Sequence, residues 1–323
     1  MALEQTAAVV MDSLSRSHGP RKIVDQFSCT LYAGEIVGLI GPNGAGKTTL
    51  IKLLLGYLRP SSGSIRIHDI DITDIKEHPE IRVGANLEDP VTYDYMTGMD
   101  HLRMTANMYK DLGPDDISGV VDLTGLKAII NKKVRTYTEG QRYMLTLAQA
   151  LLPYPQLLIL DEPTNCLDPM GIKDLRLILK KVAGKGICIL ISSHILAEMD
   201  QLCSRIIIMK DGQLVQDMKP QELLDPDRLR VEFHVGQPEK AFELVEALFD
   251  DMTIRLEDDV LIMIGQNLRV SQINRQFVFN DIDVFEINVT REPLEEYFME
   301  IMEGGQGKDP LSSGGSYVPL DSK

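Results

Sequence analysis

The sequence lacks the features that mark several common classes of protein. Its 323 residues include four cysteines, Cys29, Cys166, Cys188 and Cys203, without a CxxC pair or metal-ligand spacing, so we expect reduced, buried thiols and no disulfide framework. No apolar run approaches the roughly 20 residues that cross a bilayer. Residues 1–12 carry no basic residue before their apolar part, which predicts no signal peptide. The chain is therefore not expected to cross a membrane by itself.

Basic residues are scarce in the last third of the chain. From Leu229 onward there are 8 lysines and arginines against 19 aspartates and glutamates, and the whole chain has a net charge of −15. Binding to nucleic acid or to anionic lipid needs clusters of lysine and arginine. The composition argues against both for this region, and we expect no nucleic-acid partner.

What the sequence does contain is an alternation of strands and helices over residues 1–225. The run GEIVGLI (34–40) precedes a glycine-rich loop, and KTTLIKLLLGYL (47–58) has its leucines at helical spacing. Further strand patterns lie at 157–163, 186–194 and 204–215. The first two of these are apolar on both faces, as in parallel strands buried between helices. We predict an α/β core with a helical subdomain inserted at about residues 90–155.

Four methionines of the inserted subdomain, Met96, Met99, Met104 and Met108, admit two interpretations. Their spacing is typical of side chains that fill a helical core, which is the interpretation we favour. Methionine is also suited to an adaptable docking surface, because its side chain is flexible and polarisable.

A second unit is predicted at residues 229–303. Leu229, Val231, Phe233 and Val235 alternate with polar residues, which indicates a half-buried strand. Patterns for a helix, two strands, a helix and a strand follow. The order β-α-β-β-α-β is that of the α+β ferredoxin-like arrangement. A closing helix and a flexible, Gly/Ser-rich tail at 304–323 complete the chain.

The glycine-rich loop GPNGAGKT (41–48) matches the strand-GxxxxGK[ST]-helix pattern of a phosphate-binding loop. Glycines let backbone N–H groups turn towards phosphate oxygens, and the following helix adds the positive end of its dipole. Lys47 should reach the β- and γ-phosphates, Thr48 should bind Mg²⁺ through its hydroxyl, and Thr49 should contact the α-phosphate. The predicted nucleotide-binding residues of the loop are Gly41, Pro42, Asn43, Gly44, Ala45, Gly46, Lys47, Thr48 and Thr49.

Hydrolysis needs a metal anchor and a group that positions water. The strand LLILD brings Asp161 to its C-terminal end, where ligands bind in α/β sheets, and Glu162 follows it. We predict that Asp161 holds Mg²⁺ and that Glu162 is the general base. His194 ends the next strand pattern, so it is a candidate to contact the γ-phosphate.

These motifs, in this order, resemble the ATP-binding subunit of an ABC transporter over about residues 1–225. YTEGQ (137–141) stands where that family has its signature sequence, and NCLD (165–168) stands at its D-loop. The resemblance implies ATP and Mg²⁺ as cofactors and a head-to-tail dimer in which each signature covers the ATP of its partner. Thr138, Gly140, Gln141 and Asp168 would then complete the site of a second ATP-binding subunit.

Three residues depart from the family pattern. Glu139 replaces a signature glycine, and we expect its carboxylate to point away from the phosphates and to favour the start of the helix. Glu88 falls where the family most often has glutamine, and we expect it to ligate Mg²⁺ or to orient water. His18 falls where the family has an aromatic ring that stacks on adenine, so we expect modest selectivity for the base.

The function that the resemblance implies is ATP hydrolysis that energises an integral membrane permease, which exports a drug, a peptide or a lipid. A homodimer bound to the cytoplasmic face of the cell membrane is expected, with a docking groove beside Glu88 that includes Tyr93, Tyr95 and Met96. Two alternatives remain open: a soluble ATPase acting on ribosomes or DNA, and a regulator that binds ATP without hydrolysing it. The single phosphate loop, the lack of a long heptad array and the acidic composition oppose the first.

Overall fold

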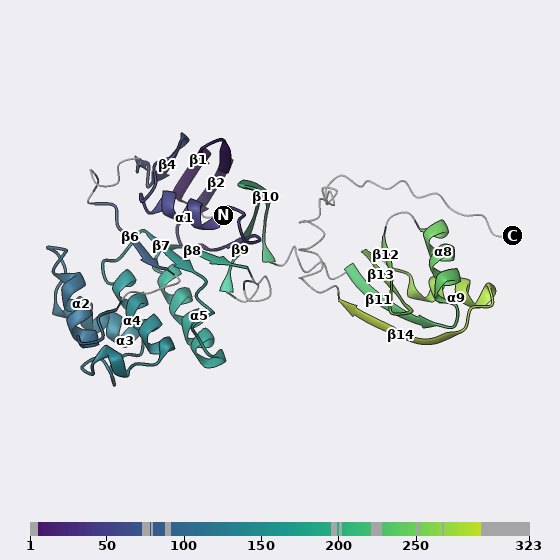
Figure 1. The fold of residues 1–323 in the computed structure, drawn as a ribbon. Helices are drawn as coiled ribbons and strands as arrows, with labels where there is room; N and C mark the ends of the chain where they lie inside the picture. The colour runs from purple at the N-terminus through teal and green to yellow at the C-terminus, as the bar shows by residue number, and fades with distance from the viewer. Residues whose placement is uncertain are drawn as a thin grey trace. The chain divides into compact units, whose positions relative to one another are not determined.

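The computed structural model describes residues 6–72, 78, 80–87, 92–194, 199, 202–220, 228–249, 252–266 and 268–291. It divides the chain into two compact units, Met1–Pro220 and Gln221–Lys323 (Figure 1). The predicted closing helix and the predicted tail lie outside the described residues.

A six-stranded sheet forms the centre of the first unit, in the order β10-β9-β3-β8-β7-β6. Its strands are β3 (Ile36–Ile40), β6 (Val83–Asn86), β7 (Leu157–Asp161), β8 (Cys188–Ser193), β9 (Arg205–Lys210) and β10 (Gln213–Met218). β3 pairs with β8 and β9 in parallel, and every residue of β3 and β8 is buried. Strands of this kind read as continuous apolar runs, because helices or a second layer cover both faces. The predicted α/β core is confirmed.

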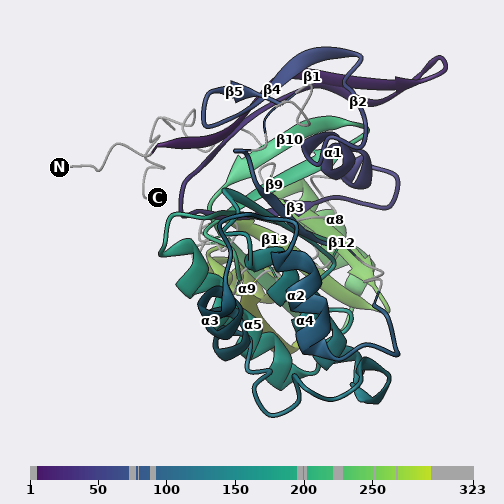
Figure 2. The ribbon, with the colours of Figure 1, turned by 90° about the vertical axis from the view of Figure 1, so that its left-hand side faces the viewer.

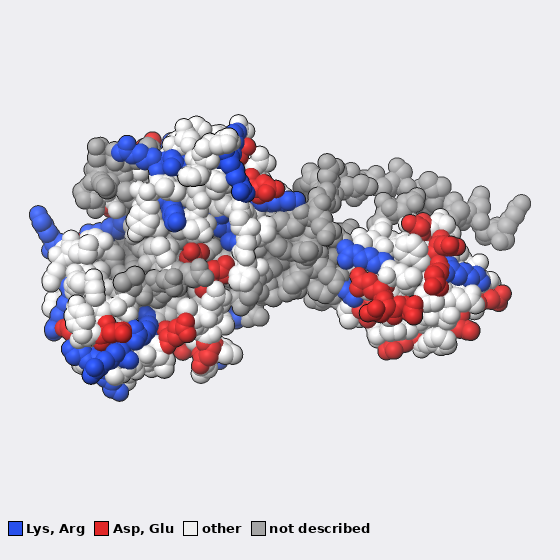
Figure 3. Space-filling model, viewed as in Figure 1, with Lys and Arg blue, Asp and Glu red and all other residues white. Residues whose placement is uncertain are grey.

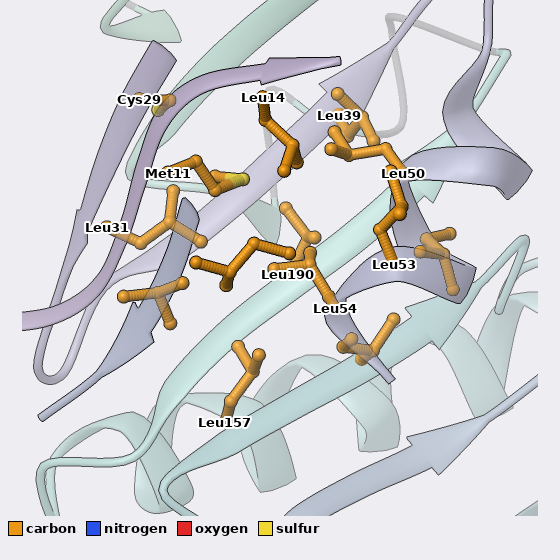
Figure 4. Close-up of a cluster of buried hydrophobic side chains, with 14 of the residues drawn as sticks. Met11, Leu14, Cys29, Leu31, Leu39, Leu50, Leu53, Leu54, Leu157 and Leu190 are labelled. Atoms are coloured by element: carbon orange, nitrogen blue, oxygen red, sulfur yellow. The ribbon is translucent and has the colours of Figure 1, made fainter. Parts of the chain in front are cut away.

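A second, antiparallel sheet was not predicted. It has the order β2-β1-β4-β5, from β1 (Ala7–His18), β2 (Arg21–Tyr32), β4 (Ser62–Ile67) and β5 (Ile70–Asp71). Its inner face packs with helix α1 (Lys47–Leu54) and the large sheet in one core, in which Leu14, Leu31 and Leu50 are almost fully buried (Figure 4). This core holds the phosphate loop between two sheets.

The inserted helical subdomain contains α2 (Gly98–Ala106), α3 (Pro114–Leu123) and α4 (Glu139–Leu151), and α5 (Pro169–Ala183) follows it. Figure 2 shows these helices at the bottom of the unit and the antiparallel sheet at the top. Thr97 begins α2 by accepting a hydrogen bond from the N–H of Asp100, whose carboxylate accepts one from the N–H of Thr97. Such a reciprocal pair satisfies two N–H groups that the helix leaves free.

The prediction that four methionines fill the core of this subdomain is wrong for two of them. Met104 is 41% exposed and Met108 is 78% exposed, while Met96 and Met99 are half-buried. The buried face of α2 is made by Leu102 and Ala106 with His101, and Met104 does not lie on it. Met104 lies on the exposed face of α2, and Met108 lies in the turn after the helix ends at Ala106.

The second unit is a four-stranded antiparallel sheet in the order β12-β13-β11-β14, with two helices. Its elements are β11 (Arg228–Val235), α8 (Pro238–Leu248), β12 (Thr253–Glu257), β13 (Val260–Gln266), α9 (Val270–Phe279) and β14 (Val284–Arg291). Asp258 and Asp259 both have positive φ, as the tight turn between β12 and β13 requires. In the core, the rings of Phe233 and Phe277 pack edge to face, with their centroids 5.2 Å apart. The predicted β-α-β-β-α-β order is confirmed, and acidic side chains are prominent on the face shown in Figure 3.

Candidate active site

The phosphate loop joins the end of β3 to the start of α1, and two of its glycines leave no room for a side chain. A Cβ atom on Gly41 would lie 2.3 Å from the carbonyl oxygen of Met209. Gly46 has a φ of 107°, and a Cβ atom there would lie 2.5 Å from the carbonyl oxygen of Ile23. The loop therefore packs closely on β9 and β2, and its conformation at Gly46 is one that only glycine adopts readily.

Lys47, the first residue of α1, is almost fully buried. Its Nζ donates a hydrogen bond to the carbonyl oxygen of Gly41 and lies 3.4 Å from that of Pro42, so the side chain runs back along the loop. Burial lowers the pKa of its ammonium, whereas the nearby carboxylates of Glu162 and Asp161 raise it. A cation in this position is ready to meet the charge of a phosphate group.

Two acidic residues lie at the end of β7: Asp161 is its last residue, and Glu162 follows it. The Ser192 hydroxyl donates a hydrogen bond to Oδ1 of Asp161, which fixes that carboxylate beside β8. Glu162 has a φ of 47°, a left-handed conformation that is costly for a residue other than glycine. Its N–H donates to the carbonyl oxygen of Ser192 at 3.1 Å, and its Oε2 lies 2.9 Å from Nδ1 of His194. Strain of this kind is concentrated at functional sites.

A cavity of about 480 Å³ joins these groups. Its lining residues are Arg21, Ile23, Pro42, Asn43, Gly44, Ala45, Gly46, Lys47, Thr48, Thr49, Asp161, Glu162, Asn165 and His194. The structure thus brings together the predicted residues of the loop, apart from Gly41 behind it, with the acids and the histidine that were predicted from distant parts of the sequence. A volume of this size is typical of sites for small ligands.

Three lining residues, Arg21, Ile23 and Asn165, were missed from the sequence. The signal for the first two is the alternation of a strand, because residues two apart point to the same side. Asn165 is part of the NCLD motif, of which we singled out Asp168 alone. His18, in contrast, is exposed at the end of β1 and is not among the residues that line the cavity. The contact of His18 with the nucleotide base stays a prediction.

The other predicted residues lie together elsewhere on the first unit. Thr138 begins α4 by accepting from the N–H of Gln141 at 3.3 Å, while Oε1 of Gln141 accepts from the N–H of Thr138 at 3.0 Å. Glu139 is exposed in the first turn, where an acid suits the helix dipole. A Cβ atom on Gly140 would lie 3.5 Å from the carbonyl oxygen of Cys166, so the start of α4 adjoins the NCLD segment.

Asp168 begins α5, where its Oδ1 accepts a hydrogen bond from the N–H of Gly171 at 2.7 Å. Together with Thr138, Gly140 and Gln141 it lies outside the lining of the cavity in its own chain. Glu88, the predicted Mg²⁺ ligand, lies outside the described residues.

Comparison with known proteins gives consistent matches. The model of the ABC transporter family matches residues 24–165. The bacitracin transport ATP-binding protein BcrA of Bacillus licheniformis is 36% identical over 294 residues, which cover 90% of this chain and 96% of that protein. The lantibiotic transport ATP-binding protein SrtF of Streptococcus pyogenes is 33% identical over 207 residues, covering 64% of this chain and 88% of that protein.

Solved structures agree on the fold of the first unit. The structure of an ATP-binding subunit of an ABC transporter has a TM-score of 0.61 and 28% identity, and covers 67% of this chain and 91% of that chain. The dimeric structure of a bacterial ABC transporter cassette has a TM-score of 0.59 at 19% identity, covering 66% and 98% respectively.

The fold and the phosphate loop define an ATP-binding cassette. The chain belongs to the ABC transporter family, in which it is an ATP-binding subunit that hydrolyses ATP to energise a transporter. In the part of the chain that the structure describes, no helix combines the length and the apolar composition that crossing a membrane requires.

Proposed function

We propose that Mg²⁺-ATP binds in the cavity between the phosphate loop, β7 and β8, and that Glu162 activates the water that attacks it. The observation that carries this proposal is that Lys47, Asp161, Glu162 and His194 line one cavity, although they come from three separate segments of the sequence. Glu162 itself has a left-handed backbone, and its side chain is directed towards His194.

The residues present fit a magnesium ion. The Thr48 hydroxyl and the Asp161 carboxylate line the same cavity, and Mg²⁺ prefers oxygen ligands of these kinds. These two residues would hold the ion, and Ser192 keeps the Asp161 carboxylate in place. When bound, the ion neutralises charge on the phosphate oxygens. We keep Glu88 as a further candidate from the sequence.

The other residues divide the remaining tasks. Lys47 donates hydrogen bonds to the β- and γ-phosphates in place of the carbonyl oxygen of Gly41. The side chain of Glu162 is 13% exposed. Its carboxylate positions the attacking water molecule and accepts a proton from it. His194 lies 2.9 Å from the Glu162 carboxylate and is 48% exposed, so it orients that carboxylate from the open side of the cavity. Contact of His194 with the γ-phosphate is part of the same proposal.

A second copy of the chain would complete the site. Thr138, Gly140, Gln141 and Asp168 adjoin one another but do not line their own cavity. The N-terminus of α4 presents N–H groups and a positive dipole end, which suit the γ-phosphate of a partner's ATP. The dimeric cassette with the same fold supports a homodimer of this kind. In it, ATP joins two chains and hydrolysis separates them.

The transport partner would be an integral membrane permease, which places the protein at the cytoplasmic face of the membrane. A cavity of about 370 Å³ beside α2 and α4, lined in part by Leu87, Thr105, Met108, Tyr109 and Gln149, suits a docking segment of that permease. The exposed Met108 at its rim gives an adaptable apolar contact.

Tyr93 and Tyr95, which we expected at the docking groove, are exposed but do not line this cavity. We keep them as candidates for contacts with the permease beside this cavity. The relatives named for bacitracin and lantibiotic transport favour an exported peptide antibiotic as the cargo, within the predicted class of drugs, peptides and lipids.

Phosphate release by the purified protein tests the catalytic part of this proposal. Wild type should release phosphate from ATP, and Glu162→Gln should bind ATP without doing so. If the two proteins release phosphate at the same low rate, the chain is a nucleotide-binding regulator and Glu162 is not a catalytic residue. Affinity purification of tagged protein from membranes should recover one polytopic membrane protein, and recovery of none would contradict the transport partner.

A further inference from the structure

The edge strand β14 (Val284–Arg291) of the second unit has no role in the proposal above. It stands last in the order β12-β13-β11-β14, so β11 covers one of its edges and no described strand covers the other (Figure 1). It is the longer of the two edge strands of this sheet, since β12 has five residues, of which Arg255 and Glu257 are charged. A free strand edge presents backbone N–H and C=O groups that can pair with a further strand.

The side chains of β14 do not guard this edge. Proteins usually protect an exposed edge with lysine, with proline or by making the strand very short. Residues 284–290 include neither lysine nor proline, and Glu286 is their one charged residue. Phe285 is 74% exposed, Val289 is 50% exposed, and Phe279, the last residue of α9, is exposed as well. Free backbone groups beside exposed apolar side chains are typical of an edge that receives a partner strand.

A partner strand on β14 would extend the core of the second unit. The pairing of β14 with β11 keeps one register over residues 286–291. Val289 lies opposite Val231 and Ile287 lies opposite Phe233, and these two residues of β11 are buried in the core. Directly opposite residues of an antiparallel pair share a face of the sheet, so Ile287 and Val289 lie on the face that the core uses.

The order of residues along β14 fits a second copy of the same strand. A twofold axis places each residue of one strand opposite a residue of the other, and the reverse. With the axis at Ile287, Phe285 of one copy meets Val289 of the other, and Glu286 of one meets Asn288 of the other. The first pair is apolar and the second joins an acceptor to a donor. Within one chain the Asn288 amide already donates to Oε1 of Glu286, at 3.2 Å.

The homodimer proposed above supplies the second β14 strand. Two second units then belong to one particle, and tethering raises the effective concentration of each for the other to about the millimolar range. A contact between two strand edges is too small to join dilute chains without that help. A basic segment of another protein would need acidic side chains along the strand, and residues 284–290 offer Glu286 alone.

We propose that the β14 strands of two copies pair antiparallel about a twofold axis at Ile287 and thereby join their two four-stranded sheets. The contact rests on the proposed homodimer, but it uses no residue of the nucleotide cavity. It links the chains through their second units, so it slows the separation of the two chains once hydrolysis has released the contacts made through ATP.

Two cysteine substitutions test the register. Phe285→Cys and Val289→Cys are each made in full-length Glu162→Gln protein, mixed with Mg²⁺-ATP and oxidised. The mixture should give a disulfide-linked dimer on a non-reducing gel, because the two new thiols lie opposite each other. Neither variant alone should exceed the background of the native cysteines. Leu256→Cys, on the other edge strand, is the matched control and should give no dimer when mixed with Val289→Cys.

A charge on the edge tests the strength of the contact. Val289→Lys in the Glu162→Gln background should raise the dissociation constant of the ATP-bound dimer in sedimentation by roughly tenfold, because the twofold axis removes two cross-strand pairs. Leu256→Lys should leave the constant as it is, since β12 lies at the opposite edge of the sheet. Equal dissociation constants for the two lysine variants would overturn the inference.

A third arm separates this inference from the nucleotide dimer. Without nucleotide, the mixture of Phe285→Cys and Val289→Cys should cross-link at about 1 mM protein, where mass action replaces tethering. If ATP doubles the mass but the mixture does not cross-link, the β14 contact is wrong and the nucleotide dimer stands. If ATP does not double the mass, the homodimer is wrong, and the nucleotide-free mixture decides: no cross-link there overturns the β14 contact. Cross-linking of Val289→Cys alone would contradict the axis at Ile287.

Discussion

Nδ1 of His194 lies 2.9 Å from Oε2 of Glu162, and the two residues directly follow the neighbouring parallel strands β8 and β7. The contact aims the carboxylate into the cavity that Lys47 and Thr48 also line. The strand register sets this distance. Asp161 pairs with Ser192, Glu162 follows Asp161 directly, and His194 lies two positions after Ser192.

Removal of the Glu162 carboxylate should stop chemistry and spare binding. Glu162→Gln keeps the size of the side chain and can still meet His194, but it cannot accept a proton. Phosphate release should fall by at least about a hundredfold, the lower limit for loss of a general base. The affinity for ATP should stay within a few-fold of wild type, and a large loss of affinity would show that Glu162 acts in binding.

Two helix caps of the same design should separate a structural from a functional role. Thr138 caps α4 and Thr97 caps α2, each through a reciprocal hydrogen-bond pair. Replacing either by alanine should cost about 0.5–2 kcal/mol of unfolding free energy, because an N–H group loses its partner. In the Glu162→Gln background, ATP should still double the mass seen by light scattering for Thr97→Ala but not for Thr138→Ala. Equal dimerisation of both variants would remove Thr138 from the proposed interface.

Buried thiols should make the protein sensitive to alkali. Burial raises the pKa of Cys29 and of Cys188 from about 9.0 to about 12. The folded state therefore keeps protons that the unfolded state releases, and the stability that each thiol contributes is present below pH 9 and is lost as the pH rises to 12. Between pH 8 and pH 10 the unfolding free energy should fall by about 1 kcal/mol for each thiol.

Urea unfolding of wild type and of Cys188→Ala at several pH values measures this difference. Other groups titrate in both proteins, so the gap between the two curves isolates the thiol. The gap should narrow as the pH rises. A constant gap would mean that the Cys188 thiol ionises equally in both states.

Two glycines should respond to alanine with opposite signs. Gly119 lies within α3, and a Cβ atom there would meet no atom within 4 Å. Gly119→Ala should raise the unfolding free energy by about 0.5–1 kcal/mol, because alanine lowers the entropy of the unfolded chain and favours the helix. A Cβ atom on Gly84 would lie 2.3 Å from the carbonyl oxygen of Ala150, so Gly84→Ala should lower it. Destabilisation by both changes would contradict the packing described for α3.

The buried parallel strands could be predicted because burial on both faces leaves a continuous apolar run. β3, β7 and β8 are examples, and the residues that end or follow β7 and β8, Asp161, Glu162 and His194, were found with them. The strand β1 was missed because its burial pattern does not alternate: its pairing with β2 shifts register at several points, including between Met11 and Leu14. Each shift reverses which side chains face the core.

The place of Arg21 and Ile23 in the lining of the cavity could not be predicted, because it depends on contacts between distant segments. Arg21 reaches the cavity only because the Ile23 carbonyl packs on Gly46 and on Gly212, which lies 189 positions further along the chain than Ile23. His18, the residue that the sequence suggested, is exposed at the end of β1 and does not line the cavity. Met104 shows the same limit, since helical spacing does not tell which face of a helix meets the core.

Because Glu162 has a positive φ, selection for stability and selection for ATP hydrolysis favour different residues at this position. Glycine would relieve the backbone there, and laboratory evolution for heat resistance alone should favour it. Proteins from such a selection would gain heat stability and lose ATP hydrolysis. If glutamate is kept when heat resistance and function are selected together, the ATPase cycle is needed for that function.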